Sequence, residues 1–157
     1  RIVIGTKKGM GIVFHEEDVR PMGRTAMGVR GVKLRGGDEV IGASRLEDDQ
    51  CVLVISENGY GKRTLASEYR EQARGGMGSR TLYVTEKTGS MCAILTVRDH
   101  EDIMLVNDQN VIIRTNADDI SVFGKAAQGV RLMRLEEGGK VLAAAKLPKD
   151  MGEEEEE

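Results

Sequence analysis

The sequence repeats itself at a spacing of about 50 residues. When the chain is shifted by 50 and then by 51 positions, Gly28 aligns with Gly78 and Gly129, and the residues around these glycines match. Three sets of apolar positions align at the same offsets: Ile4 with Val54 and Leu105, Val19 with Tyr69 and Ile120, and Leu34 with Val84 and Leu135. An ungapped match across whole units indicates similar supersecondary units packed side by side. We divide the chain into units 1–49, 50–100 and 101–149, followed by residues 150–157.

Within each unit, short runs rich in Val, Ile and Leu alternate with turn residues such as Glu57-Asn58-Gly59. Runs of this length and composition are typical of strands. The 20 glycines and two prolines favour tight hairpins. The sequence therefore predicts an all-β fold, a propeller-like array in which each unit of about 50 residues forms an antiparallel four-stranded blade.

Several classes of protein are excluded by composition. The chain has no apolar run near the roughly 20 residues that a membrane helix needs. Cys51 and Cys92 are too few for a disulfide framework and lack the spacing of a zinc site, which favours a reducing, cytoplasmic setting. His15 and His100 stand beside acidic residues in expected turns, so we predict neither a catalytic nor a metal site. The chain begins with Arg1, and we expect it to be a piece of a longer protein.

The charge is unevenly distributed along the chain. The formal net charge is -3, but residues 150–157 hold six of the 26 acidic residues and none of the 23 basic ones. The preceding units are therefore mildly basic, while the segment 150–157 is strongly acidic. We expect this segment to be a disordered tail, because it has too little apolar surface to offset the entropy of ordering. Such a tail would serve solubility or compete electrostatically with an acidic ligand of the units.

The basic residues follow the repeat. Arg24, Arg74 and Lys125 share one position, and Arg30, Arg80 and Arg131 share another. The stretches 20–35 and 120–135 contain five and three basic residues and no acidic residue. Because an ordinary surface mixes both signs, such stripes in register predict a track for a polyanion.

The scarcity of aromatic residues narrows the kind of polyanion. Aromatic residues make up 3% of the chain, and Tyr69 aligns with apolar positions, so we expect it in the core. Proteins that bind single strands need exposed aromatic side chains on which bases stack. The sequence therefore predicts contacts to the phosphates of duplex DNA, without reading of the bases.

One glycine-rich turn allows two interpretations. Gln72-Ala73-Arg74-Gly75-Gly76-Met77-Gly78 could bring backbone amides close to a phosphate, or it could simply be a hairpin tip. Gly59-Tyr60-Gly61-Lys62-Arg63-Thr64 lacks the spacing of a Walker phosphate loop, so nucleotide hydrolysis is not expected. The predicted DNA contacts are Arg20, Arg24, Arg30, Lys33, Arg35, Lys62, Arg63, Arg70, Arg74, Gly75, Gly76, Gly78, Arg80, Arg114, Lys125, Arg131 and Arg134.

Three segments resemble the C-terminal domain of the DNA gyrase A subunit. They are Val19 to Leu34, the run Asn58-Gly59-Tyr60-Gly61-Lys62-Arg63-Thr64, and Gln128 to Leu135. The resemblance implies a β-pinwheel whose last three blades and acidic tail this chain would form. The family's hallmark box has an arginine and a lysine where this chain has Ala73 and Met77, so Gln72 to Gly78 is interpreted as a degenerate equivalent.

The resemblance also implies a function and partners. The domain would wrap duplex DNA in a positive sense and so allow negative supercoiling by a type IIA topoisomerase. It would carry no catalytic residue and no cofactor of its own, since ATP and Mg²⁺ act elsewhere in the holoenzyme. The implied partners are the B subunit of gyrase with the rest of the A subunit, in an A2B2 assembly in the bacterial cytoplasm at the nucleoid, with no membrane contact.

Two other interpretations remain open at the level of sequence. The C-terminal DNA-binding domain of topoisomerase IV has the same chemistry, but it usually lacks a glycine-rich box. A propeller-type scaffold for protein interactions would need an exposed apolar or aromatic patch. A propeller enzyme is disfavoured, because the chain lacks clustered catalytic side chains.

Overall fold

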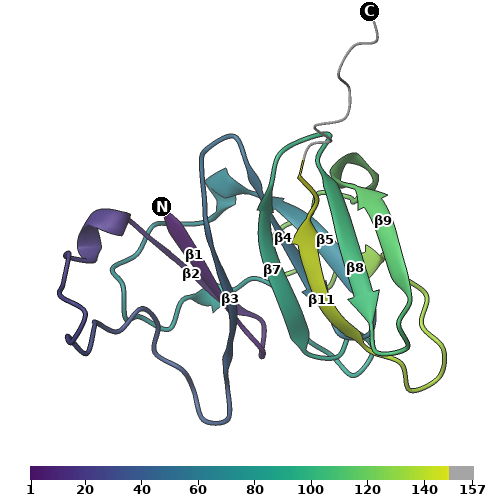
Figure 1. The fold of residues 1–157 in the computed structure, drawn as a ribbon, viewed down its shortest axis with the longest axis horizontal. Coiled ribbons are helices and arrows are strands. Elements are labelled where there is room, and N and C mark those ends of the chain that lie inside the picture. The colour runs from purple at the N-terminus through teal and green to yellow at the C-terminus, as the bar shows by residue number, and fades with distance from the viewer. Residues whose placement is uncertain (149–157) are drawn as a thin grey trace, which may run out of the picture.

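The computed structural model describes residues 1–148, which form short antiparallel strands and three 3₁₀ helices (Figure 1). The strands are β1 (Ile2–Thr6), β2 (Met10–Phe14), β3 (Val40–Arg45), β4 (Cys51–Ser56), β5 (Tyr60–Leu65), β6 (Ser79–Arg80), β7 (Met91–Val97), β8 (Asp102–Asn107), β9 (Ile112–Asn116), β10 (Val130–Arg131) and β11 (Val141–Lys146). The helices are η1 (Glu16–Asp18), η2 (Ala66–Glu68) and η3 (Ala117–Asp119). The all-β prediction is confirmed, while the tail of residues 150–157 lies outside the described residues.

The strands form three sheets, and the long strands of each sheet come from one repeat unit. The first sheet has the order β3-β1-β2-β6, the second β10-β5-β4-β7 and the third β11-β8-β9. The two-residue strands β6 and β10 are exchanged: β6 comes from the second unit and completes the first sheet, while β10 comes from the third unit and completes the second sheet. The predicted four-stranded blade thus needs a strand from the following unit, and the third sheet has three strands among the described residues.

Each of the first two units begins with the same hairpin, and its sequence explains the turn. The side chains of Thr6 and Ser56 accept a hydrogen bond from the backbone N–H four residues later, at 3.2 and 3.1 Å. Gly9 and Gly59 then adopt positive φ angles of 87° and 86°, which glycine tolerates without steric cost. The hairpin strands therefore leave each turn in the same register.

Three aligned segments of the chain are called arms: the first arm is 19–34, the second 69–84 and the third 120–135. The exchanged strands β6 and β10 lie in the second and third arms. The backbone N–H groups of Thr81 and Leu82, in the second arm, donate to the carbonyl of Gly9 at 2.8 and 3.2 Å. In the third arm, the N–H groups of Leu132 and Met133 donate to the carbonyl of Gly59 at 2.7 and 3.3 Å. Each of these arms therefore lies on the hairpin of the preceding unit.

The core lies between the sheets, and β4 is buried on both of its faces. Val52 and Val54 pack in a cluster with residues of the first sheet, whereas Leu53 and Ile55 pack in a cluster with residues of the third. This double burial explains why β4 is a continuous apolar run and does not alternate. The second sheet is the middle layer of the array (Figure 1).

The arms contribute side chains to both clusters. Tyr69 and Leu82 of the second arm are buried in the cluster beneath the first sheet, and Ile120 and Met133 of the third arm are buried in the cluster of the second and third sheets. The prediction that Tyr69 belongs to the core is confirmed, since its side chain is 4% exposed. An arm is therefore part of the core of the unit that it covers.

We predict that the glycines at the centre of the arms are needed for strand exchange. A Cβ atom on Gly78 or Gly129 would lie 2.2 or 2.3 Å from the carbonyl oxygen of Gly11 or Gly61, whereas a Cβ atom on Gly28 would have no neighbour within 4 Å among residues 1–148. All three residues have positive φ. Substitution to Ala should cost about 1 kcal/mol at Gly28 from φ alone, and roughly 1–3 kcal/mol more at Gly78 or Gly129 from the clash.

Urea unfolding of the three single variants measures these differences. Gly28→Ala is the matched control, because it changes the same residue at the same φ without the contact. Equal losses of stability in all three variants would contradict the prediction.

Candidate nucleic-acid interface

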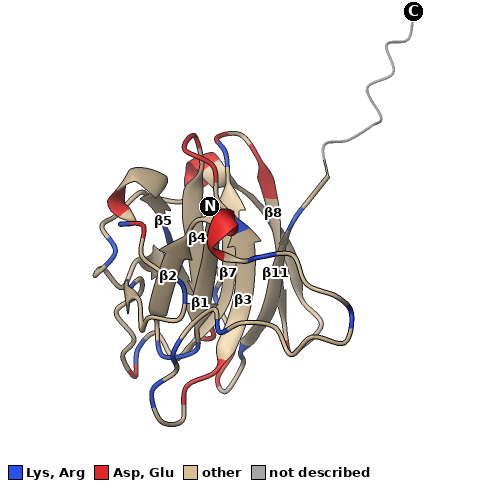
Figure 2. Cartoon of the chain, turned by 90° about the vertical axis from the view of Figure 1, so that its left-hand side faces the viewer, with Lys and Arg blue, Asp and Glu red and all other residues tan. Residues whose placement is uncertain are grey.

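Most of the predicted basic residues are exposed, and most of the exposed ones lie on the arms. Within residues 1–148, the following predicted cations are exposed and form no ion pair with a carboxylate: Arg20, Arg24, Arg30, Lys33, Arg35, Arg70, Arg80, Arg131 and Arg134. Figure 2 shows that Lys and Arg residues are found largely on the loops around the sheets. The arms therefore carry a set of cations whose charge is available to an anionic ligand.

The prediction is corrected for Lys62 and Arg63, whose side chains are buried. The ammonium group of Lys62 is fully buried and donates to the carbonyls of Gly124 and Lys125, the latter at 2.7 Å. Arg63 donates from Nε to the carbonyl of Ile120 at 2.7 Å and pairs with Asp99 at 3.1 Å. Both side chains hold the third arm against β5, so in this structure neither is presented to DNA.

The glycine-rich turn is also used within the protein. The N–H of Gly75 donates to the carbonyl of Gly31 at 2.7 Å, and the carbonyl of Gly76 accepts from the backbone N–H of Lys33 at 2.8 Å. The guanidinium of Arg74 donates to the carbonyls of Asp18 and Arg30 at 2.8 and 3.2 Å. The turn therefore ties the second arm to the first, and the Gly75 amide is not free to cradle a phosphate. Gly78, as described above, permits close approach to β2.

Two further predicted cations already have partners. Lys125 is partly buried, donates from Nζ to the hydroxyl of Ser79 at 3.1 Å, and lies 5.5 Å from the centre of the Tyr69 ring. Arg114 pairs with Asp102, with its Nε 2.9 Å from the carboxylate. Lys125 thus links the second and third arms, whereas the charge of Arg114 is compensated by its neighbour on β8.

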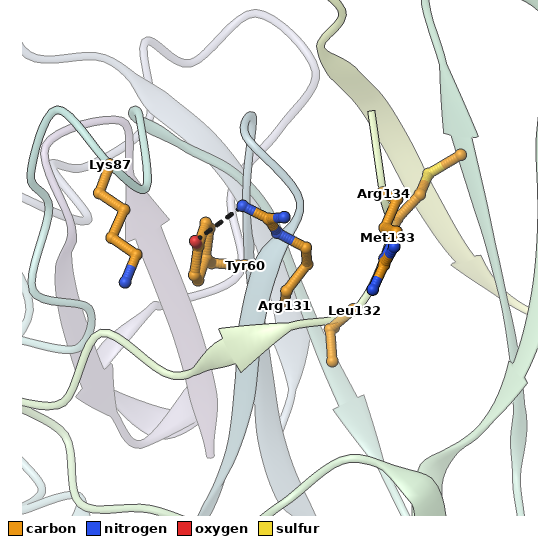
Figure 3. Close-up of a pocket in the computed structure, with 6 residues that line it drawn as sticks. All are labelled: Tyr60, Lys87, Arg131, Leu132, Met133 and Arg134. Carbon is orange, nitrogen blue, oxygen red and sulfur yellow. Dashed lines mark hydrogen bonds between the residues drawn. The ribbon is translucent and has the colours of Figure 1, made fainter. Parts of the chain in front are cut away.

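A cleft of about 620 Å³ lies beside β5 and β10 and is lined by Tyr60, Lys87 and the segment 131–134. Figure 3 shows Lys87 and Arg131 on either side of the Tyr60 ring, and their charged groups lie 5.5 and 5.4 Å from its centre. Arg131 also donates to the Tyr60 hydroxyl at 3.1 Å. The aromatic ring holds the two cations near each other by cation–π attraction, which makes the cleft a candidate phosphate site.

Sequence reasoning missed Lys87. It aligns with Gly37 and Gly138 of the other units, so it belongs to no repeated basic position. Its neighbours Glu86 and Thr88 give no sign of a basic stripe. Lys87 lies 27 residues after Tyr60 in the same unit, and this separation indicates a shared site only when the positions of the hairpins in space are known.

Burial shifts the pKa values of several groups in the core. Burial lowers the pKa of Lys62 from 10.5 to about 8, and the charge of Glu68 opposes this shift. Burial raises the pKa of the Cys92 thiol to about 12, so the thiol stays protonated and unreactive at neutral pH. Among residues 1–148, no three His, Cys, Asp or Glu residues are grouped to hold a metal ion, and no helix is long and apolar enough to span a membrane.

The lowered pKa of Lys62 predicts how stability depends on pH. Between about pH 8 and 10.5, the unfolded chain retains a proton on this amine that the folded chain has released. The contribution of Lys62 to the free energy of unfolding therefore rises with pH between these two values. We expect the free energy of unfolding of the wild type, relative to that of Lys62→Met, to increase between these limits in parallel urea titrations. A constant or falling difference would contradict the assignment.

The fold and surface define a class of protein: a propeller-like array of β-blades joined by exchanged arms, with cations along those arms. The model of the family described as DNA gyrase C-terminal domain, beta-propeller, matches residues 1–47, 52–90 and 101–148. The chain belongs to this family.

The similarity of the chain to curated proteins is consistent with this family assignment. The chain is 50% identical over 148 residues to the DNA gyrase A subunit of Staphylococcus epidermidis (strain ATCC 12228), in an alignment that covers 93% of this chain and 17% of the relative. It is 48% identical over 158 residues to the DNA gyrase A subunit of Staphylococcus aureus (strain MRSA252), covering 99% of this chain and 18% of the relative. The chain thus spans less than a fifth of the length of these relatives.

Solved structures show the same fold. A DNA gyrase A C-terminal domain superposes with a TM-score of 0.87 at 31% identity, covering 94% of this chain and 50% of that one. A topoisomerase IV C-terminal domain gives the same TM-score of 0.87 at 22% identity, covering 93% of this chain and 46% of that one. At that lower identity the match supports the fold alone.

Proposed function

We propose that this chain binds duplex DNA through its backbone phosphates and wraps it in a positive sense, as part of the DNA-wrapping domain of a gyrase. The observation that carries the proposal is the set of exposed cations at repeated positions of the arms, which have no carboxylate partner among residues 1–148. Arg24 and Arg30 of the first arm, Arg80 of the second and Arg131 of the third belong to this set.

Contacts between the arms support a continuous path for the DNA. The guanidinium of Arg74 in the second arm donates a hydrogen bond to the carbonyl of Arg30 in the first arm. The ammonium of Lys125 in the third arm donates to the hydroxyl of Ser79 in the second arm, next to Arg80. Because each arm is bonded to its neighbour, its cations follow those of the preceding arm around the array. A path of this kind suits a bent polyanion.

The positions of the aromatic residues favour phosphate contacts over base contacts. Phe14, Tyr60 and Tyr69 are 2%, 6% and 4% exposed, and cannot act as open stacking platforms. Tyr83 is 46% exposed, but the guanidinium of Arg80 lies 5.1 Å from the centre of its ring. Binding through cations alone is insensitive to sequence and strongly dependent on salt.

The catalytic steps would belong to other parts of the larger enzyme. In a gyrase, the B subunit together with the rest of the A subunit would provide strand cleavage and ATP-driven strand passage, while this domain presents a wrapped segment. A topoisomerase IV domain is the second candidate, because such a domain would bind DNA through the same phosphate contacts. The turn Gln72 to Gly78 and the gyrase relatives favour the first.

We predict a specific change in the salt dependence of DNA binding. For Arg131→Ala/Arg134→Ala, the slope of log affinity against log salt should become shallower by about 1.8, since each phosphate contact contributes about 0.9. Fluorescence anisotropy with a duplex of roughly 40 base pairs across a salt series measures this slope.

Arg98→Ala is the matched control for the loss of a positive charge. Arg98 is paired with Asp49 at 2.8 Å and with Glu47, so its charge is already compensated. Its removal should leave the slope unchanged. A slope for the double variant equal to that of the wild type would contradict the assignment of this site.

A second prediction concerns the sense of the wrap. Plasmid closed by ligase in the presence of the chain should gain positive supercoils, in proportion to bound protein, and the Arg131→Ala/Arg134→Ala variant should reduce the gain. Two-dimensional gels that separate topoisomers by sign make the measurement. Negative supercoils, or no shift at saturating protein, would refute positive wrapping while leaving phosphate binding in place.

A further inference from the structure

Tyrosine rings contact the aligned arginines of the second and third arms. The guanidinium of Arg80 in the second arm lies 5.1 Å from the centre of the Tyr83 ring. The guanidinium of Arg131, at the aligned position of the third arm, lies 5.4 Å from the centre of the Tyr60 ring (Figure 3). At such distances the electron-rich face of the ring attracts a cation. The two arginines therefore have the same kind of aromatic support.

The two rings come from different positions of the repeat. Tyr60 lies on β5, where it pairs across the sheet with Arg131. At the aligned position of β2, Arg80 pairs with Met10, which has no aromatic ring. The ring beside Arg80 comes instead from Tyr83, three residues further along the same arm. Because two unrelated positions supply the same contact, the contact is a feature of the arginine position and does not simply follow from the repeat.

The backbone that carries the Tyr83 ring is fixed on both sides. The preceding residue, Leu82, is fully buried, and its N–H donates to the carbonyl of Gly9 in the first hairpin at 3.2 Å. The N–H of Tyr83 itself donates to the carbonyl of Ala127 in the third arm at 3.3 Å. Nearly half of the Tyr83 side chain remains exposed. The ring is therefore an anchored support at the protein surface.

The support matters because Arg80 has a charge that is available to a ligand. Arg80 is exposed, and it forms no ion pair with a carboxylate among residues 1–148. A long, exposed side chain samples many rotamers and loses this freedom when it binds. A ring that already restricts the guanidinium reduces that loss, so binding becomes tighter without any new contact to the ligand.

We propose that Tyr83 is a positioning residue for DNA binding, which holds the Arg80 guanidinium in place for a phosphate of the duplex. The inference rests on the proposed function and adds an uncharged residue to it. The aligned residues of the other two arms are the cations Lys33 and Arg134. The second arm thus has a ring where the others have a charge, and this ring strengthens the contact made by its neighbour.

The proposal separates the affinity for DNA from its salt dependence. The slope of log affinity against log salt reflects the number of phosphates that the protein neutralises. Tyr83→Leu removes no charge, so affinity should fall by about 2- to 5-fold at every salt concentration while the slope stays the same. Arg80→Ala removes a charge and should make the slope shallower by about 0.9.

A double-mutant cycle shows whether Tyr83 acts through Arg80. Fluorescence anisotropy with duplex DNA compares the wild type, each single variant and Arg80→Ala/Tyr83→Leu across the salt series. Tyr83→Leu should weaken binding in the wild-type background and have no effect in the Arg80→Ala background. Tyr83→Phe is the matched control, because it keeps the ring and should bind like the wild type. Equal losses in both backgrounds would overturn the proposal, since Tyr83 would then act independently of Arg80.

A measurement without DNA tests the contact itself. In NMR spectra of the free chain, the ring current should shift side-chain protons of Arg80 upfield in the wild type and in Tyr83→Phe, and the shift should be lost in Tyr83→Leu. Its absence from the wild type would overturn the positioning role even where DNA binds. If Tyr83→Leu does not fold, Tyr83→Gln removes the ring at the same exposed position.

Failure of this inference is distinguishable from failure of the proposed function. A wild type that does not bind duplex DNA at low salt would overturn the proposed function, and the positioning role of Tyr83 with it. A wild type that binds normally, with Tyr83→Leu indistinguishable from it at every salt concentration, would overturn the role of Tyr83 alone.

Discussion

The structure depends on the hydrogen bonds that an arm makes with one carbonyl of the hairpin before it. The carbonyls of Gly9 and Gly59 each accept two backbone N–H groups of an arm. These bonds set the register of β6 and β10, each of which is only two residues long. Everything that an arm carries, both apolar and charged, is positioned by this small contact.

The energies explain why so short a strand is sufficient. Burial of Leu82 or Met133 stabilises by about 1.5–3 kcal/mol, and two hydrogen bonds add about 1 kcal/mol each. A whole domain is stable by only about 5–15 kcal/mol. One arm therefore supplies a substantial share of the stability of the unit that it covers. It also places cations of one unit over the sheet of another, which links packing to the proposed DNA path.

Much of the fold could be predicted because the repeat is regular. The aligned apolar positions identify Tyr69 and Ile120 as core, and the three units each supply the long strands of one sheet. Strand exchange could not be predicted, because a strand of two residues has no periodicity. Val19 shows the cost of relying on alignment alone: it shares the pattern but is exposed, since its arm covers no hairpin in the described chain.

The site could be predicted less completely, for reasons that the contacts make clear. Their charge predicts that Lys62 and Arg63 lie at the surface. Both side chains are buried instead, and backbone carbonyls of the third arm accept their hydrogen bonds. A glycine-rich turn suggests a phosphate contact for Gly75, yet its N–H serves the first arm. Lys87 reaches the cleft beside Tyr60 through a loop whose path the sequence does not reveal.

Native-state hydrogen exchange tests the central role of the arms most directly. If the arms hold the array together, the amides of Thr81 and Leu132 should exchange as slowly as those of the central strand β4, while the amide of Gly31 exchanges at nearly the rate of an unstructured peptide. Exchange of Thr81 and Leu132 as fast as that of Gly31 would show that the exchanged arms are incidental to the fold.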